Sequence, residues 1–173
     1  MKKLFFVSII VFQSVMIFAQ EFQVPMNYKL ETEEECIEQE SNILAAINWL
    51  NNNPMNVENV KQWESVYKFL WEWAGNVPYL SITFGNTAEP AFKGNAEIGI
   101  IYVGGYVQYA LTTREFDNKN EQIIAGIEAI VDYYTTHRKE LKKNSTLEKF
   151  VKLQKEEKLR EYILKNERKN ASR

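Results

Sequence analysis

Three tyrosines at helical spacing are the residues of this sequence best placed to form a binding surface. Tyr102, Tyr106 and Tyr109 follow one another at intervals of four and three residues, so a helix would place their rings on one face. Tyrosine rings with polar tips line many ligand pockets, and they also fill the edges of protein cores. The first interpretation predicts a helical pocket protein that holds an apolar or aromatic ligand, and the second predicts packing.

Two adjacent glycines, Gly104 and Gly105, interrupt the same apolar stretch. A phosphate-binding loop needs a lysine and a hydroxyl residue directly after its glycines, whereas Tyr106 and Val107 follow here. The spacing to Gly99 excludes a dinucleotide-binding loop, and adjacent glycines do not match membrane helix pairing, which uses glycines four apart. Two glycines in a helix cost about 1 kcal/mol each relative to alanine. We therefore expect another helix or a ligand to lie against this bare backbone.

Trp71 and Trp73 flank Glu72 in a second stretch that suggests ligand contact. Residues two apart on a helix point to different sides, so we expect Trp73 in the core and Trp71 at its edge, within reach of a ligand. Glu72 could act as a catalytic acid only opposite a second carboxylate, and no spacing identifies one. A small envelope hydrolase with a carboxylate pair assembled from different helices therefore stays an alternative, although the sequence favours a non-catalytic protein.

Metal and cofactor sites are not indicated by the residue inventory. His137 is the single histidine and Cys36 the single cysteine, so a histidine-rich metal site and an intrachain disulfide are both excluded. A carboxylate-only calcium site would need an aspartate-rich loop, and the sequence has only Asp117 and Asp132. We predict no cofactor, and we expect Cys36 to be a small buried residue.

The first twenty residues have the pattern of a secretory signal peptide. Lys2 and Lys3 precede an apolar run that ends near Ala19, which is the order that export machinery reads. A retained membrane anchor is the weaker alternative, because Gln13 and Ser14 interrupt the run. We expect export to the periplasm or the outside, with no membrane span left after cleavage.

Apolar periodicity in the rest of the chain predicts an all-α fold, an irregular bundle of about five helices with one extended segment at 79–84. Residues 98–103 could instead form a strand beside that segment, but the length of the apolar stretch favours a helix. We expect a lead-in at 21–31, one domain over 32–166 and a frayed basic tail at 167–173. The expected helices cover residues 32–50, 57–74, 96–113, 120–139 and 145–166, and the polar run at 154–158 favours a turn or break within the last of them.

Charge divides the chain into an acidic body and a basic end. Residues 21–137 contain 6 basic and 17 acidic residues, a net charge of −11, and residues 138–173 contain 13 basic and 6 acidic residues, a net charge of +7. The basic end could bind an anionic surface or pack back on the acidic body. Glutamates interleave the basic residues and no aromatic-basic pattern accompanies them, so no nucleic-acid partner is indicated.

The order of several short motifs resembles a group of short, exported helical proteins of Bacteroidota that have no assigned activity. The motifs are Trp71-Glu72-Trp73 before Pro78, and then Gly104-Gly105-Tyr106 before Tyr109. This resemblance implies a bacterial, helical, exported protein and carries over no functional residue. We therefore expect a domain that acts by binding an unidentified protein or envelope component, in an oligomeric state that the sequence does not indicate.

Overall fold

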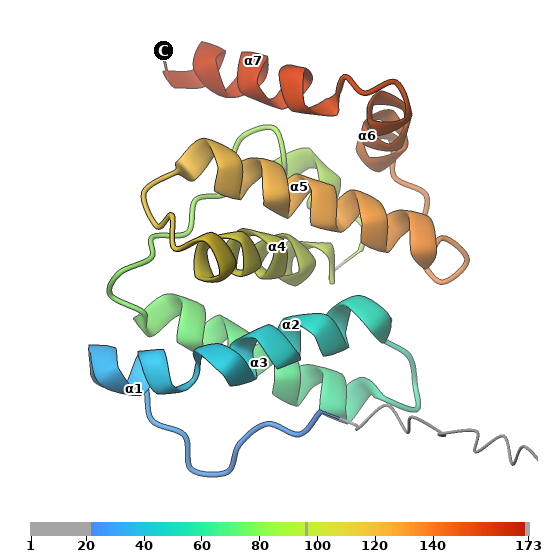
Figure 1. Ribbon diagram of the computed structural model, residues 1–173. Helices are drawn as coiled ribbons and strands as arrows, with labels where there is room; N and C mark the ends of the chain where they lie inside the picture. The colour runs from blue at the N-terminus through green and yellow to red at the C-terminus, as the bar shows by residue number, and fades with distance from the viewer. Residues whose placement is uncertain (1–21, 96, 172–173) are drawn as a thin grey trace, which may run out of the picture.

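A computed structural model of the chain describes residues 22–95 and 97–171. Those residues contain helices and connecting segments but no strand, which confirms the predicted all-α class (Figure 1). The predicted signal peptide, residues 1–20, lies outside the described residues. The helices are α1 (Glu33–Glu38), α2 (Glu40–Asn52), α3 (Val60–Asn76), the short 3-10 helix η1 (Glu89–Phe92), α4 (Ile98–Thr113), α5 (Lys119–Thr136), α6 (Ser145–Lys155) and α7 (Leu159–Ala171).

The described residues form seven α-helices rather than about five, because two of the expected helices are broken. The helix that begins at the Thr32–Glu35 capping box is interrupted at Gln39, where the backbone N–H bonds to Cys36 O three residues back. The break between α6 and α7 includes Glu157, whose φ of 58° is left-handed. Neither break contains a proline or glycine. The second break falls in the polar run at 154–158, where a turn was expected, and the first break was not expected. The last helix also continues beyond the predicted boundary at residue 166.

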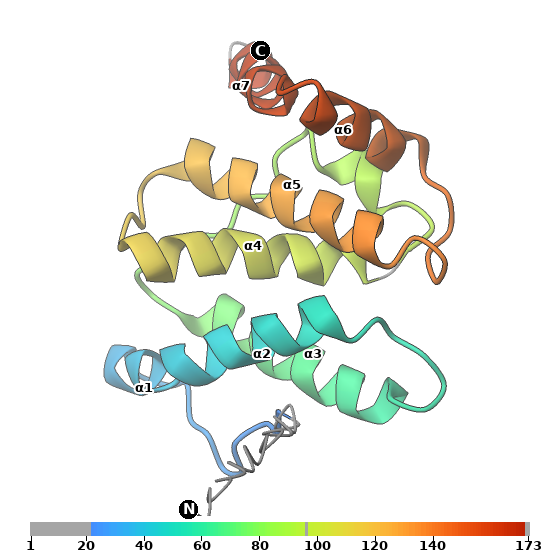
Figure 2. The same ribbon diagram turned by 45° about the vertical axis from the view of Figure 1, so that its right-hand side comes forward.

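The helices stack in three layers. Helices α1 to α3 form one outer layer, α4 and α5 form the central layer, and α6 with α7 forms the other outer layer (Figures 1 and 2). The central helix α4 is covered along most of its length, and eleven of its residues are buried. This burial confirms the prediction that residues 98–103 belong to a helix, because an apolar surface on all sides of a helix requires neighbours on all sides.

Glycines allow α4 and α5 to touch at their backbones. A Cβ atom on Gly105 would lie 2.5 Å from Cβ of Ala129 and 2.6 Å from the carbonyl oxygen of Ala125. A Cβ atom on Gly126 of α5 would lie 2.7 Å from the ring of Tyr102. On another side of α4, Gly104 faces the side chain of Ile47 from α2. Close helix contact is therefore what compensates for the helix-weakening effect of these glycines.

Residues 79–84 pair with no strand among the described residues. Instead, side chains of α4 form hydrogen bonds with their backbone. The hydroxyl of Tyr102 donates a hydrogen bond to Thr83 O at 2.8 Å, and the hydroxyl of Tyr106 donates to Ser81 O at 2.9 Å. Four helical residues rise about 6.0 Å, and two extended residues span about 6.6 Å, so the two spacings match. The segment therefore runs antiparallel to α4 with one edge satisfied by tyrosine side chains.

The basic C-terminal helices pack on the body of the protein. Phe150 of α6 and Ile163 of α7 are buried, and Asn144 caps α6 while its side-chain amide donates to Ala91 O and Lys93 O. Glu167 accepts hydrogen bonds from both the backbone N–H and the hydroxyl of Thr87. These contacts favour packing over the free basic tail that the charge pattern left open.

None of the helices in residues 22–95 and 97–171 combines the length and apolar character needed to cross a membrane.

Candidate functional site

The three predicted tyrosines make different contacts in the described residues. Tyr102 and Tyr106 are buried side by side, with ring centroids 6.2 Å apart, and both hydroxyls are bonded to the 79–84 segment. Burial raises the pKa of both phenols, since it disfavours the charged form. Tyr109 lies farther along the helix, where its hydroxyl donates to Glu115 Oε2 at 2.5 Å. Tyr102 and Tyr106 therefore hold residues 79–84 in place. We call these residues, which lie between α3 and η1, the connecting segment.

The two predicted glycines face protein atoms. Ile47 Cγ2 lies 3.2 Å from the position of a Cβ on Gly104, and atoms of α5 lie closer still to that of Gly105. These contacts fill the space in which a ligand could lie against the helix backbone. Of the two interpretations open for this pair, the geometry supports contact between helices.

Trp71 is the predicted residue that lies at an open hollow. Its side chain is 46% exposed, and beside it is a hollow of about 140 Å³ with a mainly apolar lining. Helix α3 supplies Trp71, Ala74 and Gly75, the 79–84 segment supplies Ile82 and Phe84, and α4 supplies Val103. We call this feature the aromatic hollow. It lies where the first layer, the central layer and the connecting segment meet.

Aromatic contacts hold the walls of the aromatic hollow. The ring of Trp71 is nearly parallel to that of Tyr67, at an interplanar angle of 5° and a centroid distance of 6.2 Å. On the opposite wall, Phe84 stacks on Tyr102 at 5.6 Å and meets Phe92 edge-on at 5.8 Å. Phe84 is nevertheless 43% exposed. The rings of Trp71 and Phe84 also contact each other, at a centroid distance of 6.4 Å and an angle of 33°. Neighbouring rings thus fix both exposed side chains, which lowers the entropy cost of binding.

Sequence reasoning missed most of the aromatic hollow. At Gly75 nothing lies within 4 Å of where a Cβ would be, so the missing side chain helps to keep the hollow open. The alternation of Leu80, Ile82 and Phe84 indicated a half-buried segment but not which helix it would face. That alternation together with an edge tryptophan was the only available signal.

A buried cluster of one carboxylate, one phenol and one imidazole lies at the start of α4 and the end of α5, away from the aromatic hollow. Glu97, directly before α4, accepts a hydrogen bond from the Tyr133 hydroxyl at 2.9 Å. The ring of Tyr133 contacts that of His137, whose Nε2 lies 2.9 Å from Asn51 O. Burial raises the pKa of Glu97, while the Tyr133 hydrogen bond and the nearby His137 act in the opposite direction. Glu97 and Tyr133 are both buried, so this hydrogen bond lies inside the protein.

This raised pKa predicts a pH-dependent effect of Glu97→Gln. The folded protein binds the Glu97 proton more tightly than the unfolded chain, so the carboxyl weakens the fold at neutral pH, and stability recovers as the pH falls through the folded pKa. Glutamine keeps an acceptor for Tyr133 and carries no charge. We expect Glu97→Gln to have a higher urea midpoint than the native protein at pH 7, with the difference shrinking toward pH ~4.3, the usual glutamate pKa.

Urea titrations at pH 4 to 7 measure this effect, and Glu89→Gln, at an exposed position in η1, is the control. A midpoint difference for Glu97→Gln that is the same at every pH would contradict the expectation.

A second charged cluster joins α2 to the end of α4. Glu40 is buried and accepts two hydrogen bonds from Arg114, at 2.8 and 2.7 Å, and one from the Tyr79 hydroxyl at 2.9 Å. Burial and the Glu40 carboxylate both raise the pKa of Tyr79. Arg114 has a left-handed φ of 61° at the end of α4, which turns its side chain back toward α2. This cluster ties two layers together and leaves Glu40 no free oxygen for catalysis.

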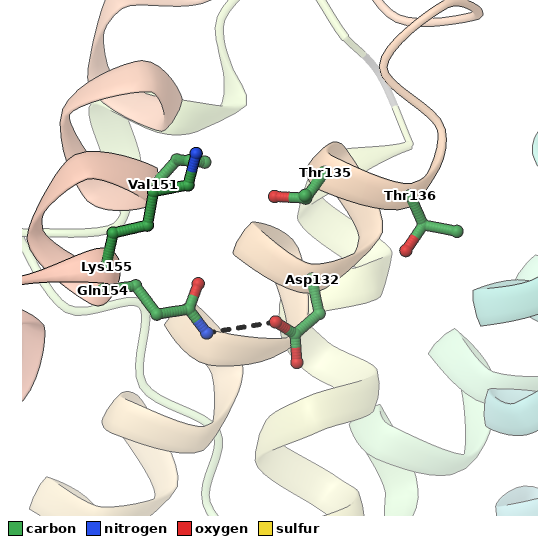
Figure 3. A pocket seen from close by; sticks show the side chains of 6 residues that line it. All are labelled: Asp132, Thr135, Thr136, Val151, Gln154 and Lys155. Atoms are coloured by element: carbon green, nitrogen blue, oxygen red, sulfur yellow. Dashed lines mark hydrogen bonds between the residues drawn. The ribbon is translucent and has the colours of Figure 1, made fainter. Parts of the chain in front are cut away.

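No carboxylate pair faces an opening in the hollows described here. Asp132 lies at a groove of about 270 Å³ between α5 and α6, where it accepts a hydrogen bond from Gln154 Nε2 at 3.1 Å (Figure 3). It is the one carboxylate lining that groove, beside Lys155 and two threonines. Glycoside hydrolysis by two carboxylates needs a second one across the substrate. Within the described residues there is also no group of three or more histidine, cysteine or acidic side chains that could hold a metal.

Comparison with known proteins identifies no similar protein. No family model, no curated protein and no solved structure matches this chain. The argument for function therefore rests on the geometry of the site alone.

Proposed function

We propose that this chain is an exported, non-catalytic helical domain that acts by binding, and that the aromatic hollow is its binding site. The observation that carries the proposal is the pairing of Trp71 and Phe84. Both large aromatic side chains are more than two-fifths exposed, and they border the same hollow. Exposed apolar side chains scattered singly are ordinary, but two rings that meet over a cavity mark a place where a partner is held.

The size and lining of the aromatic hollow indicate what enters it. Its volume of about 140 Å³ is close to that of an engineered protein cavity that binds benzene. No charged side chain is among its lining residues, so a buried charge would find no partner there. One uncharged aromatic or large aliphatic group fits this environment, and tryptophan at the rim is typical of residues that dominate binding energy.

A fluorinated amino-acid amide tests this function directly. N-acetyl-4-fluorophenylalanine amide carries one uncharged ring, and fluorine NMR reports its binding. We expect a dissociation constant of roughly 1 mM or below and at least about a tenfold weakening in Trp71→Ala, because the variant removes one aromatic wall.

Ile37→Ala is the matched control, since Ile37 is 48% exposed on α1 and does not line the hollow. Equal affinity of Trp71→Ala and the native protein would count against the aromatic hollow as the site.

A further inference from the structure

We propose that the partner is an extended peptide segment that pairs with the open edge of residues 80–84 and inserts one large apolar side chain into the aromatic hollow. The inference rests on the proposed function, because it takes the aromatic hollow as the binding site, and it adds the backbone conformation and the charge of the partner. The main support for this inference is the pattern of backbone hydrogen bonds in residues 79–84.

One edge of the segment is already occupied. Ser81 O and Thr83 O accept the tyrosine hydroxyls of α4, and the N–H of Gly85 lies 3.5 Å from the Tyr102 hydroxyl. Alternate residues of an extended chain direct their backbone groups to opposite edges. The carbonyls of Ser81 and Thr83 therefore identify the inner edge, and the backbone groups of Ile82 and Phe84 belong to the outer edge.

The outer edge has the properties of an unpaired strand. Within the part of the chain that the structure describes, the backbone N–H and C=O groups of Ile82 and Phe84 make no hydrogen bond to protein. Ser81 and Phe84 are exposed, and Ile82 and Thr83 are half-buried, so the segment lies at the surface. An extended edge with free donors and acceptors is a template for strand addition, in which main-chain bonds give affinity and a side-chain pocket gives specificity.

The aromatic hollow adjoins this edge. Ile82 and Phe84 contribute side chains to the hollow, so a peptide lying along the segment would pass directly beside it. A side chain that points from the peptide toward the hollow lies against Trp71 and Phe84, whose ring centroids are 6.4 Å apart. Because α4 already holds the segment extended, the protein loses little conformational freedom on binding.

Charge complementarity indicates the residues that flank the inserted side chain. The layer that supplies Trp71 is acidic, with nine acidic and two basic residues between positions 31 and 76, a net charge of −7. Lysine or arginine on either side of the apolar residue is therefore favoured over aspartate or glutamate. The partner that fits is a basic, extended segment with one aromatic residue.

A capped heptapeptide, acetyl-Lys-Thr-Thr-Phe-Thr-Thr-Lys-amide, tests the inference, with binding measured by fluorescence anisotropy of a labelled form. Two further versions of the peptide carry N-methyl groups on alternate residues. One version is methylated at the odd positions and the other at the even positions, so that each blocks the N–H groups of one edge. Only one edge of the peptide can face residues 80–84, so the two versions control for each other. We expect one of them to bind about tenfold more weakly than the parent, from the loss of about two hydrogen bonds, and the other to bind like the parent.

Hydrogen exchange gives the second measurement. We expect the amides of Ile82 and Phe84 to exchange more slowly when the parent heptapeptide is bound, and the version with phenylalanine replaced by alanine to give no such protection. Equal affinities of the two N-methylated peptides, or unchanged exchange at Ile82 and Phe84, would overturn the strand-pairing inference.

The small fluorinated amide separates the two proposals. If the amide binds at Trp71 but the heptapeptide binds no more tightly, strand pairing is overturned and the proposed function stands. If neither binds, the proposed function fails and the inference fails with it.

Discussion

Gly105→Ala is expected to destabilise the protein by about 2–3 kcal/mol and to lower its melting temperature by roughly 6–10 °C. The new Cβ would lie 2.5 Å from Ala129 Cβ and 2.6 Å from a backbone oxygen of α5, and neither atom belongs to a flexible side chain. Two helices must therefore move apart, and a tightly packed core loses contacts along their whole interface. Thermal melts followed by circular dichroism measure the effect.

Two other glycines of α4 provide the controls. Gly99 has nothing within 4 Å of its Cβ position, so Gly99→Ala should raise stability by up to about 1 kcal/mol through helix propensity. At Gly104 the nearest atom is the movable Cγ2 of Ile47, at 3.2 Å, and we expect an intermediate result. If Gly105→Ala were as stable as Gly99→Ala, direct contact between α4 and α5 would be refuted.

Glu40→Ala is expected to cost about 2–3 kcal/mol, or roughly 5–10 °C in melting temperature. The carboxylate is buried and joins Arg114 and Tyr79 through three hydrogen bonds. Its removal leaves a half-buried tyrosine hydroxyl without its acceptor, which costs more than the loss of one exposed ion pair. Arg114 is 60% exposed, so water solvates its guanidinium and limits the loss.

A surface pair of the same type serves as the comparison for Glu40. Glu121 forms a two-point contact with Arg160, but the Glu121 side chain is 26% exposed against 10% for Glu40, and no buried tyrosine shares the carboxylate. Glu121→Ala should therefore cost less than about 1 kcal/mol. Equal losses for Glu40→Ala and Glu121→Ala would show that burial adds nothing to the Glu40 cluster.

Local patterns predicted the helices well because each depends on neighbouring residues. The Thr32–Glu35 capping box is present as expected, and the apolar stretch that contains Gly104 forms a helix. The break at Gln39 was not expected, and it lies directly before Glu40, whose partners Tyr79 and Arg114 are distant in the sequence.

The candidate site could be predicted only in part, because its residues are brought together by tertiary contacts. Trp71 was expected at the edge of the core, but its companion Phe84 comes from a segment whose orientation is set by tyrosine hydroxyls. The shared helix face of the three tyrosines left a pocket and core packing open, and Tyr102 and Tyr106 are buried with their hydroxyls bonded to backbone carbonyls. Periodicity identifies a face and does not identify what covers it.

The tyrosine hydrogen bonds also fix the register of the connecting segment. A slip by one residue would exchange the inward and outward side chains, and a slip by two would leave either Ser81 O or Thr83 O without its hydroxyl partner. The segment therefore has one position along α4, although it belongs to no sheet. Because Ile82 and Phe84 cannot slide past Trp71, the aromatic hollow keeps a single shape, which is set by two phenol groups outside its lining.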